Sequence, residues 1–220
     1  MAAGFLALGD SYTIGEGVAP ADRWPAQMAA RLRESGTSVA DPTIVATTGW
    51  TTGELAAALD AATLAPPYAL VTLLIGVNNQ YRGLPLVAYR NEFRALLTRA
   101  VAWAGAVASR VVVVSIPDWG VTPFAAQSGR DRAAVAREID AFNAAAQAAT
   151  IAAGAQWVDI TAVSRSPAAA DECAADGLHP SAAQYARWAE AILPIARAAL
   201  EAHQENFGAA RHPGAGRDPF

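Results

Sequence analysis

The chain has 220 residues, of which 53% are hydrophobic, and its 16 basic and 20 acidic residues give a net charge of −4. This is the size of a single domain, and the composition excludes an intrinsically disordered chain. The basic residues are scattered, which argues against nucleic acid or an anionic membrane as a partner, and one cysteine excludes a disulfide framework or a multi-cysteine metal centre.

Short apolar runs that we predict to be strands alternate along the chain with segments of helical spacing. The predicted strands are residues 5–8, 42–46, 68–75, 110–116 and 156–160. The predicted helices are residues 24–35, 51–63, 86–108, 131–153 and 181–203. Asp22 is a candidate N-cap of the first helix, and Thr51 with Glu54 forms a capping-box pattern at the second. The alternation predicts an α/β fold with a mostly parallel sheet covered by helices on both faces.

Three further expectations concern the domain boundary, membrane segments and the location of the protein. Residues 1–203 are predicted to form a single domain, and residues 204–220, with their glycines and prolines, a flexible C-terminal tail. No apolar run approaches the roughly 18 residues that span a bilayer, so no integral membrane segment is expected. The N-terminal residues lack a basic region and a full apolar core before Asp10, which predicts a cytoplasmic location. Nothing in the pattern indicates an oligomeric state.

Ligands of open parallel sheets bind at the carboxyl ends of the strands, so the residues that follow each predicted strand are the first candidates for function. Gly9-Asp10-Ser11 follows the first strand. A serine where a strand turns toward a helix can present its hydroxyl to the crevice, but it needs a base to become a nucleophile. The same three residues also fit an ordinary turn.

The sequence Asp176-Gly-Leu-His179 supplies a candidate base. A carboxylate three residues before an imidazole can accept a hydrogen bond from one ring nitrogen and leave the other free to take a proton. His203 and His212 lie at the predicted helix end and in the tail, where solvated surface residues are expected.

Two further strand ends carry candidate hydrogen-bond donors. Asn78 follows the third strand, and its side-chain NH₂ can donate to an oxygen that becomes anionic, although a loop asparagine can also bond its own backbone. Gly49 follows the second strand, where its N–H can be a second donor. Gly53 is the alternative glycine, but it lies inside the predicted helix cap.

Taken together, Gly9-Asp10-Ser11, Gly49, Gly76-x-Asn78 and Asp176-x-x-His179 resemble the four motif blocks of the GDSL esterase/lipase family of the SGNH hydrolase superfamily, over residues 5 to 200. The resemblance implies a flavodoxin-like, three-layer α/β/α sandwich with a mostly parallel five-stranded sheet. It implies Ser11 as nucleophile, His179 as general base with Asp176 as its partner, and an oxyanion hole formed by Ser11, Gly49 and Asn78. It implies no metal and no cofactor.

Two positions depart from the family pattern. Tyr12 stands where the first block often has leucine, a variation that the family tolerates, and Asn79 stands where the third block usually has aspartate. The second change leaves the Asn78 donor in place.

The expected reaction is the hydrolysis of a small-molecule ester with a short acyl chain, because the loops are short and carry no long apolar lid. Residues that follow predicted strands and could contact substrate are Trp50, Asn79, Tyr81, Arg82 and Trp119. Arg82 could equally pair with a neighbouring carboxylate. Sugar acetates, lysophospholipids and thioesters remain open as substrates. Two different classes remain as alternatives: a metallophosphoesterase that uses Asp10, Asn78 and His179 as ligands, and a non-catalytic binding module.

Overall fold

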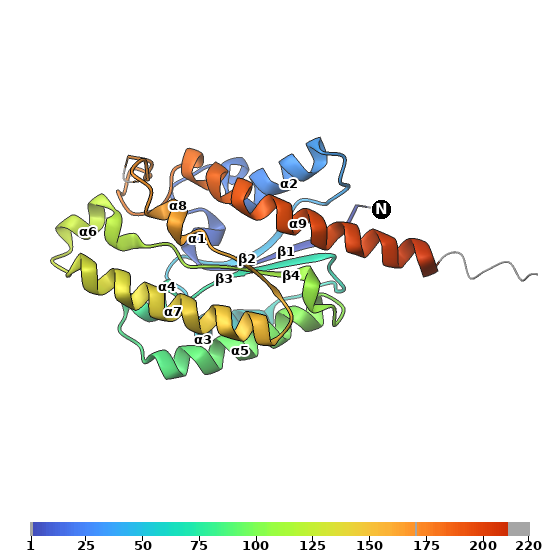
Figure 1. Cartoon of the computed structure of the whole chain (residues 1–220), viewed down its shortest axis with the longest axis horizontal. Coiled ribbons are helices and arrows are strands. Elements are labelled where there is room, and N and C mark those ends of the chain that lie inside the picture. Colours follow the sequence, from blue (N-terminus) through green and yellow to red (C-terminus); the bar gives the residue numbers. More distant parts are fainter. Residues whose placement is uncertain (1, 170, 211–220) are drawn as a thin grey trace, which may run out of the picture.

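The structure, a computed structural model, describes residues 2–169 and 171–210 and contains one five-stranded sheet (Figure 1). The strands are β1 (Phe5–Gly9), β2 (Thr43–Ala46), β3 (Leu70–Leu74), β4 (Val111–Val114) and β5 (Gln156–Val158). Their order across the sheet is β2-β1-β3-β4-β5, and every neighbouring pair is parallel. All residues of β1, β3 and β4 are buried, which explains why these strands appear in the sequence as continuous apolar runs.

Helices cover both faces of the sheet, as Figure 1 shows. On one face α2 (Trp24–Glu34) packs against α9 (Ala182–Ala210), and on the other α5 (Leu86–Trp103) lies between α3 (Thr52–Ala61) and α7 (Arg132–Ala152). The predicted α/β class, the parallel sheet and the three layers are therefore confirmed. In the described part of the chain, no helix is long and apolar enough to cross a membrane.

Several boundaries differ from the prediction for local reasons. Asp22 does not cap α2, because residues Pro20–Asp22 form a 3₁₀ turn (η1) and Arg23 takes the N-cap position without a side-chain bond. Helix α5 ends at Trp103 rather than residue 108, since Gly105 turns the chain at φ +72°. Strand β4 ends at Val114 because the N–H of Ile116 donates to the Asn143 side chain.

Helix α9 continues to Ala210, beyond the predicted end at residue 203. No proline interrupts the sequence between residues 204 and 210, and the first one after them is Pro213. The rest of the predicted tail, residues 211–220, lies outside the described residues.

Short elements at the carboxyl edge of the sheet were not predicted. They are α1 (Ser11–Ile14), α4 (Val77–Tyr81), α6 (Pro123–Gln127), α8 (Thr161–Ser164) and the 3₁₀ turn η3 (Trp119–Val121), while a further unpredicted 3₁₀ turn, η2 (Ala108–Arg110), lies at the opposite edge, just before β4. Each is too short to show a helical period in the sequence. Two of them matter for the site, since α1 follows β1 and α4 follows β3. These strands are neighbours at the point where the strand order reverses, which is where ligands bind in open α/β sheets.

Candidate active site

Ser11 is the first residue of α1, directly after the turn that ends β1. Asp10 is the N-cap of this helix, and its Oδ1 accepts a hydrogen bond of 3.0 Å from the backbone N–H of Tyr12. This cap holds the turn that presents the Ser11 side chain. Ser11 is only 4% exposed, yet it lines a cavity at the carboxyl edge of the sheet.

His179 and Asp176 are joined within one tight loop. The Nδ1 of His179 lies 2.5 Å from Oδ2 of Asp176, while Oδ1 of Asp176 accepts the backbone N–H groups of Leu178 (2.9 Å) and His179 (3.0 Å). Burial alone would raise the pKa of Asp176, but these three hydrogen bonds together hold it below its usual value. An ionised Asp176 keeps the proton of the imidazole on Nδ1, which leaves Nε2 to accept one.

Asn78 lies on α4, one residue into the helix, and its amide is oriented by the backbone. Its Nδ2 donates to the carbonyl oxygen of Trp50 at 2.9 Å. A carbonyl is only an acceptor, so this bond fixes which end of the amide carries the NH₂ group. The second hydrogen of Nδ2 stays available to the cavity that Asn78 lines.

Gly49 lies in the turn between β2 and α3. The turn is closed by a hydrogen bond of 3.3 Å from the N–H of Trp50 to the carbonyl of Thr47, and Gly49 adopts φ +86°, which favours glycine. Gly49 lines the same cavity as Asn78. The two candidate oxyanion donors therefore come from the ends of two different strands and meet at one place.

The cavity has a volume of about 180 Å³ and brings together four of the five predicted catalytic and oxyanion-hole residues: Ser11, Gly49, Asn78 and His179. The rest of its wall is mostly apolar and is formed by Tyr12, Thr48, Val77, Tyr81, Trp119, Phe124 and Leu178. Within the described residues, the Ser11 hydroxyl makes no hydrogen bond to His179. In free enzymes such bonds are often long and tighten when substrate is bound.

Of the five predicted substrate contacts, the structure places Tyr81 and Trp119 in the cavity wall and the other three elsewhere. Asn79 is buried, with Oδ1 accepting from the N–H of Thr52 (3.0 Å) and Nδ2 donating to its hydroxyl (2.7 Å). Trp50 contributes its backbone carbonyl to Asn78. Arg82 pairs with Glu54 at 3.2 Å, which is the carboxylate alternative left open by the sequence.

Asp10 has a property that sequence reasoning missed. The residue is fully buried, and its Oδ2 has no hydrogen-bond partner among the residues that the structure describes. Burial raises the pKa of Asp10 to about 7, more than the Tyr12 N–H lowers it. In the unfolded chain the pKa of an aspartate is about 3.9, so the folded state binds this proton more tightly. The contribution of Asp10 to stability is therefore fully present below about pH 4 and is lost as the pH rises through 7.

We expect Asp10→Asn to remove this pH dependence. Asparagine keeps the oxygen that caps α1 but cannot ionise, so the free energy of unfolding of the variant should exceed that of the wild type by at least about 1 kcal/mol at pH 8. Urea unfolding at pH 5 and pH 8 measures the difference. Asp131→Asn is the matched control, since Asp131 caps α7 from an exposed position. A wild-type protein that is equally stable at both values would contradict the expectation.

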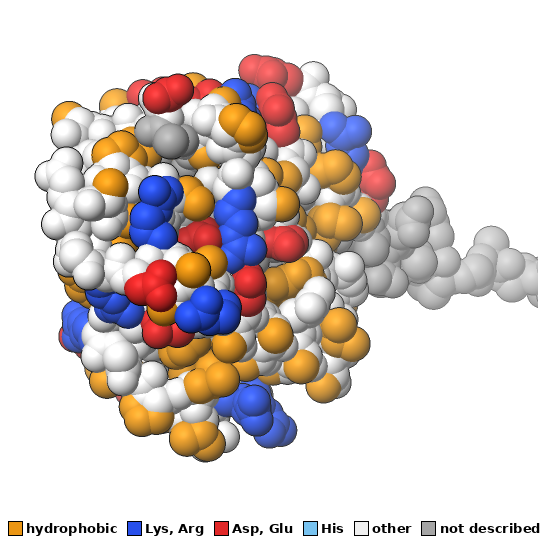
Figure 2. Space-filling model, turned by 60° about the vertical axis from the view of Figure 1, so that its left-hand side comes forward, with side chains coloured by type: hydrophobic (Ala, Val, Ile, Leu, Met, Phe, Trp, Pro, Cys, Tyr) orange, Lys and Arg blue, Asp and Glu red, His pale blue; other side chains and the backbone are white. Residues whose placement is uncertain are grey.

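The metal-based alternative finds no ligand set in the described part of the chain, where no three His, Cys, Asp or Glu side chains are grouped so that they could hold a metal ion. The scattering of the basic residues noted in the sequence is visible on one face of the molecule, where acidic side chains lie between the basic ones (Figure 2). The residues that line the cavity offer a serine hydroxyl, an imidazole and N–H donors beside a mostly apolar wall.

Comparisons with known proteins point in the same direction. The sequence profile of the GDSL-like lipase/acylhydrolase family matches residues 7–187. Among solved structures, TesA is 21% identical with a TM-score of 0.68, and the alignment covers 89% of this chain and 99% of that one. A lipase/acylhydrolase from Enterococcus faecalis is 19% identical with a TM-score of 0.72, covering 90% and 96%. Axe2, an acetylxylan esterase from Geobacillus stearothermophilus, is 19% identical with a TM-score of 0.65, covering 88% and 94%. No protein of curated function matches the chain.

Proposed function

Because this chain belongs to the GDSL-like lipase/acylhydrolase family, we propose that it is a serine esterase that hydrolyses small carboxylic esters with short acyl chains. Membership of this family makes the chain a carboxylic ester hydrolase. The identity of its catalytic residues and of its substrate is what we propose. The observation that carries the proposal is the single cavity lined by Ser11, His179, Gly49 and Asn78, with Asp176 bonded to the far side of the imidazole.

In the proposed mechanism Ser11 Oγ attacks the ester carbonyl while Nε2 of His179 takes the hydroxyl proton. The carbonyl oxygen becomes an oxyanion and accepts hydrogen bonds from the backbone N–H groups of Ser11 and Gly49 and from Nδ2 of Asn78. His179 then gives its proton to the leaving alcohol, and an acyl group remains on Ser11. A water molecule, deprotonated by His179, attacks this acyl-enzyme, and His179 returns the proton to Ser11 Oγ as the bond to the acyl group breaks and the acid is released. Asp176 stabilises the imidazolium in both steps.

The size of the cavity supports a short acyl chain. A cavity of about 150 Å³ is known to hold a benzene molecule, so about 180 Å³ leaves room for an acyl group of roughly that size. Trp119 forms part of the wall, is only 2% exposed, and packs edge to face against the Tyr81 ring at 5.3 Å. A longer chain would need this indole to move.

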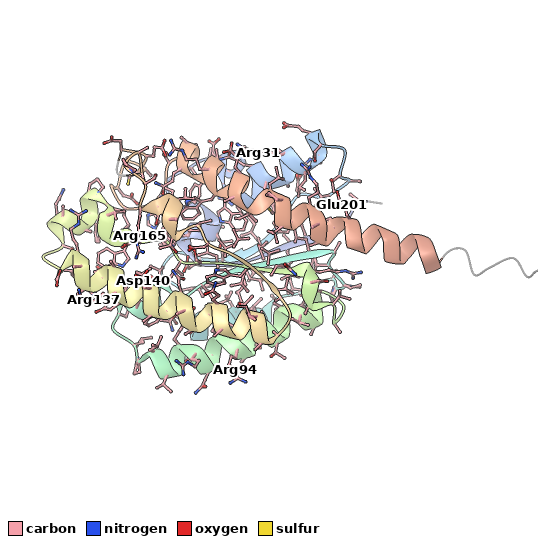
Figure 3. The ribbon with its side chains drawn as sticks, viewed as in Figure 1. Arg31, Arg94, Arg137, Asp140, Arg165 and Glu201 are labelled. Carbon is pink, nitrogen blue, oxygen red and sulfur yellow. The ribbon has the colours of Figure 1, made fainter. Side chains whose placement is uncertain are left out.

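Trp119 is held from two sides. Its Nε1 donates to Oε1 of Gln80 at 2.8 Å, and Nε2 of Gln80 donates to Glu138 at 2.5 Å. On the other side Asp118, which begins η3, is buried and pairs with Arg165 at 2.8 Å. Arg165 also bonds Asp140 on α7 at 2.8 Å, and the two side chains point toward one another in Figure 3. These contacts hold Trp119 in the wall of the cavity, which supports the proposed limit on chain length.

We expect Trp119 to determine how the rate of hydrolysis depends on the length of the acyl chain. With p-nitrophenyl esters of two to sixteen carbons, the wild type should hydrolyse the acetate faster than the palmitate, and Trp119→Ala should raise kcat/KM for medium chains by about 10-fold or more. Trp103→Ala is the control, because Trp103 lies at the end of α5 and packs against Arg99. Faster turnover of palmitate than of acetate by the wild type would refute the proposed substrate class.

A further inference from the structure

Side chains from two positions of α4 and from its C-cap residue bind the segment from Gly49 to Glu54. Asn78 Nδ2 donates to the Trp50 carbonyl at 2.9 Å, and Asn79 makes two hydrogen bonds to Thr52. The third is Arg82, the C-cap of α4, which reaches the carbonyl oxygen of Gly49 with Nη2 at 2.5 Å. These four hydrogen bonds connect the segment after β3 with the segment after β2.

The guanidinium of Arg82 contacts two groups at once. While Nη2 donates to Gly49, Nη1 pairs with Oε1 of Glu54 at 3.2 Å. Glu54 is itself fixed, because its Oε2 accepts the N–H of Thr51 at 2.8 Å in the capping box of α3. A planar fork with several donors suits such a double contact, which a point charge cannot reproduce. Arg82 thus links the Gly49 peptide to the rigid first turn of α3.

We propose that Arg82 is a positioning residue of the oxyanion hole, holding the turn that carries the Gly49 N–H in register with the Asn78 amide. This inference rests on the proposed function. Arg82 does not line the cavity, and its contacts are with the carbonyl and the carboxylate, so it acts through Gly49 rather than on the substrate. Thr48, next to Gly49, is bonded to Glu16, which holds the turn from the side of α1.

The expected effect follows from how strictly oxyanion donors must be placed. An ion pair between two half-exposed side chains adds little to stability, so the loss of Arg82 should scarcely change the folded state. A donor that moves by about 1 Å, however, can reduce catalysis by about 100-fold. The two donors stabilise charge that exists only in the transition state, and the loss should therefore appear in kcat rather than in KM.

The chain offers a closely matched control in Arg33. Its side chain is 42% exposed against 46% for Arg82, and it pairs with Asp41 at 3.0 Å. It also donates to a backbone carbonyl, that of Val39, at 3.3 Å. Arg33 lies near the end of α2 and outside the cavity. A general effect of losing a half-exposed, doubly bonded arginine would appear in both variants.

The test compares Arg82→Ala and Arg33→Ala with the wild type in p-nitrophenyl acetate hydrolysis, thermal unfolding and backbone hydrogen exchange. For Arg82→Ala we expect kcat to fall by about 10- to 100-fold with KM within about twofold of the wild-type value. Tm should shift by no more than about 4 °C in either variant. Exchange of the segment from residue 47 to residue 51 should become faster in Arg82→Ala and stay unchanged in Arg33→Ala.

Three results would overturn the inference: an unchanged kcat, a raised KM at unchanged kcat, or a lower kcat without faster exchange in that segment. Failure of the proposed function is a separate result, because it would appear as hydrolysis that survives Ser11→Ala or as a wild type without turnover. The exchange measurement reports on the contacts of Arg82 with Gly49 and Glu54 in either case.

Discussion

Replacing Ser11 with alanine is expected to lower kcat on the order of 10⁶-fold, because the acyl-enzyme cannot form without the hydroxyl. His179→Ala should cost a similar factor, since an unactivated serine is a poor nucleophile at neutral pH. The double variant should be little worse than either single one, because the two side chains act as one unit. Residual catalysis in all three would come from the oxyanion donors and substrate binding.

Steady-state hydrolysis of p-nitrophenyl acetate measures these rates. Ser35→Ala serves as the matched control, since Ser35 caps α2 and its hydroxyl donates to the Leu32 carbonyl outside the cavity. Rates near the wild-type value in Ser11→Ala would rule out the nucleophile that we assign. A well-folded wild type that turns over no ester of a broad panel would instead favour the non-catalytic binding module.

The second large effect is expected for Asn78→Ala, which should lower kcat by about 10²- to 10³-fold. Alanine removes the side-chain donor to the oxyanion, while the backbone donors of Ser11 and Gly49 remain. The bond from Asn78 to Trp50 is also lost, at a cost of about 1 kcal/mol in stability. Such a change in stability leaves the protein folded and cannot by itself account for the expected loss of rate.

Kinetics of Asn78→Ala separate the two contributions. The fall should appear in kcat with little change in KM, and Asn91→Ala, at an exposed position on α5, should leave both unchanged. A higher KM at an undiminished kcat would mean that Asn78 binds the ground state of the substrate and is not an oxyanion donor.

The parts of the fold that were predictable from sequence depend on local chemistry. The strands β1, β3 and β4 are buried on both faces, so their apolar runs identify them directly. The capping box at Thr51 lies within four consecutive residues and formed as predicted. The family was also recognisable from short motifs, because three of them follow strands whose positions the pattern indicated, and the fourth, Asp176 with His179, lies within four consecutive residues of one loop.

Predictions for the cavity wall were only partly right, and the reason lies in α4. Its five residues, Val77–Tyr81, are too few to show a period, so the sequence does not reveal which of them face inward. In the structure Asn78 and Tyr81 line the cavity, whereas Asn79 turns to Thr52. The position of Arg82 depends on Gly49, a residue 33 positions earlier in the chain. Contacts of this kind follow from tertiary packing and leave no local pattern.

The most direct test of the central claim is to trap the acylated residue with a fluorophosphonate ester, which transfers a phosphonyl group to an activated serine. Mass spectrometry of the digested protein should find a single adduct, on the peptide that contains Ser11. Labelling should be absent in Ser11→Ala and much slower in His179→Ala. An adduct on another residue, or full inhibition of hydrolysis without an adduct on Ser11, would contradict the assignment of Ser11 as the nucleophile.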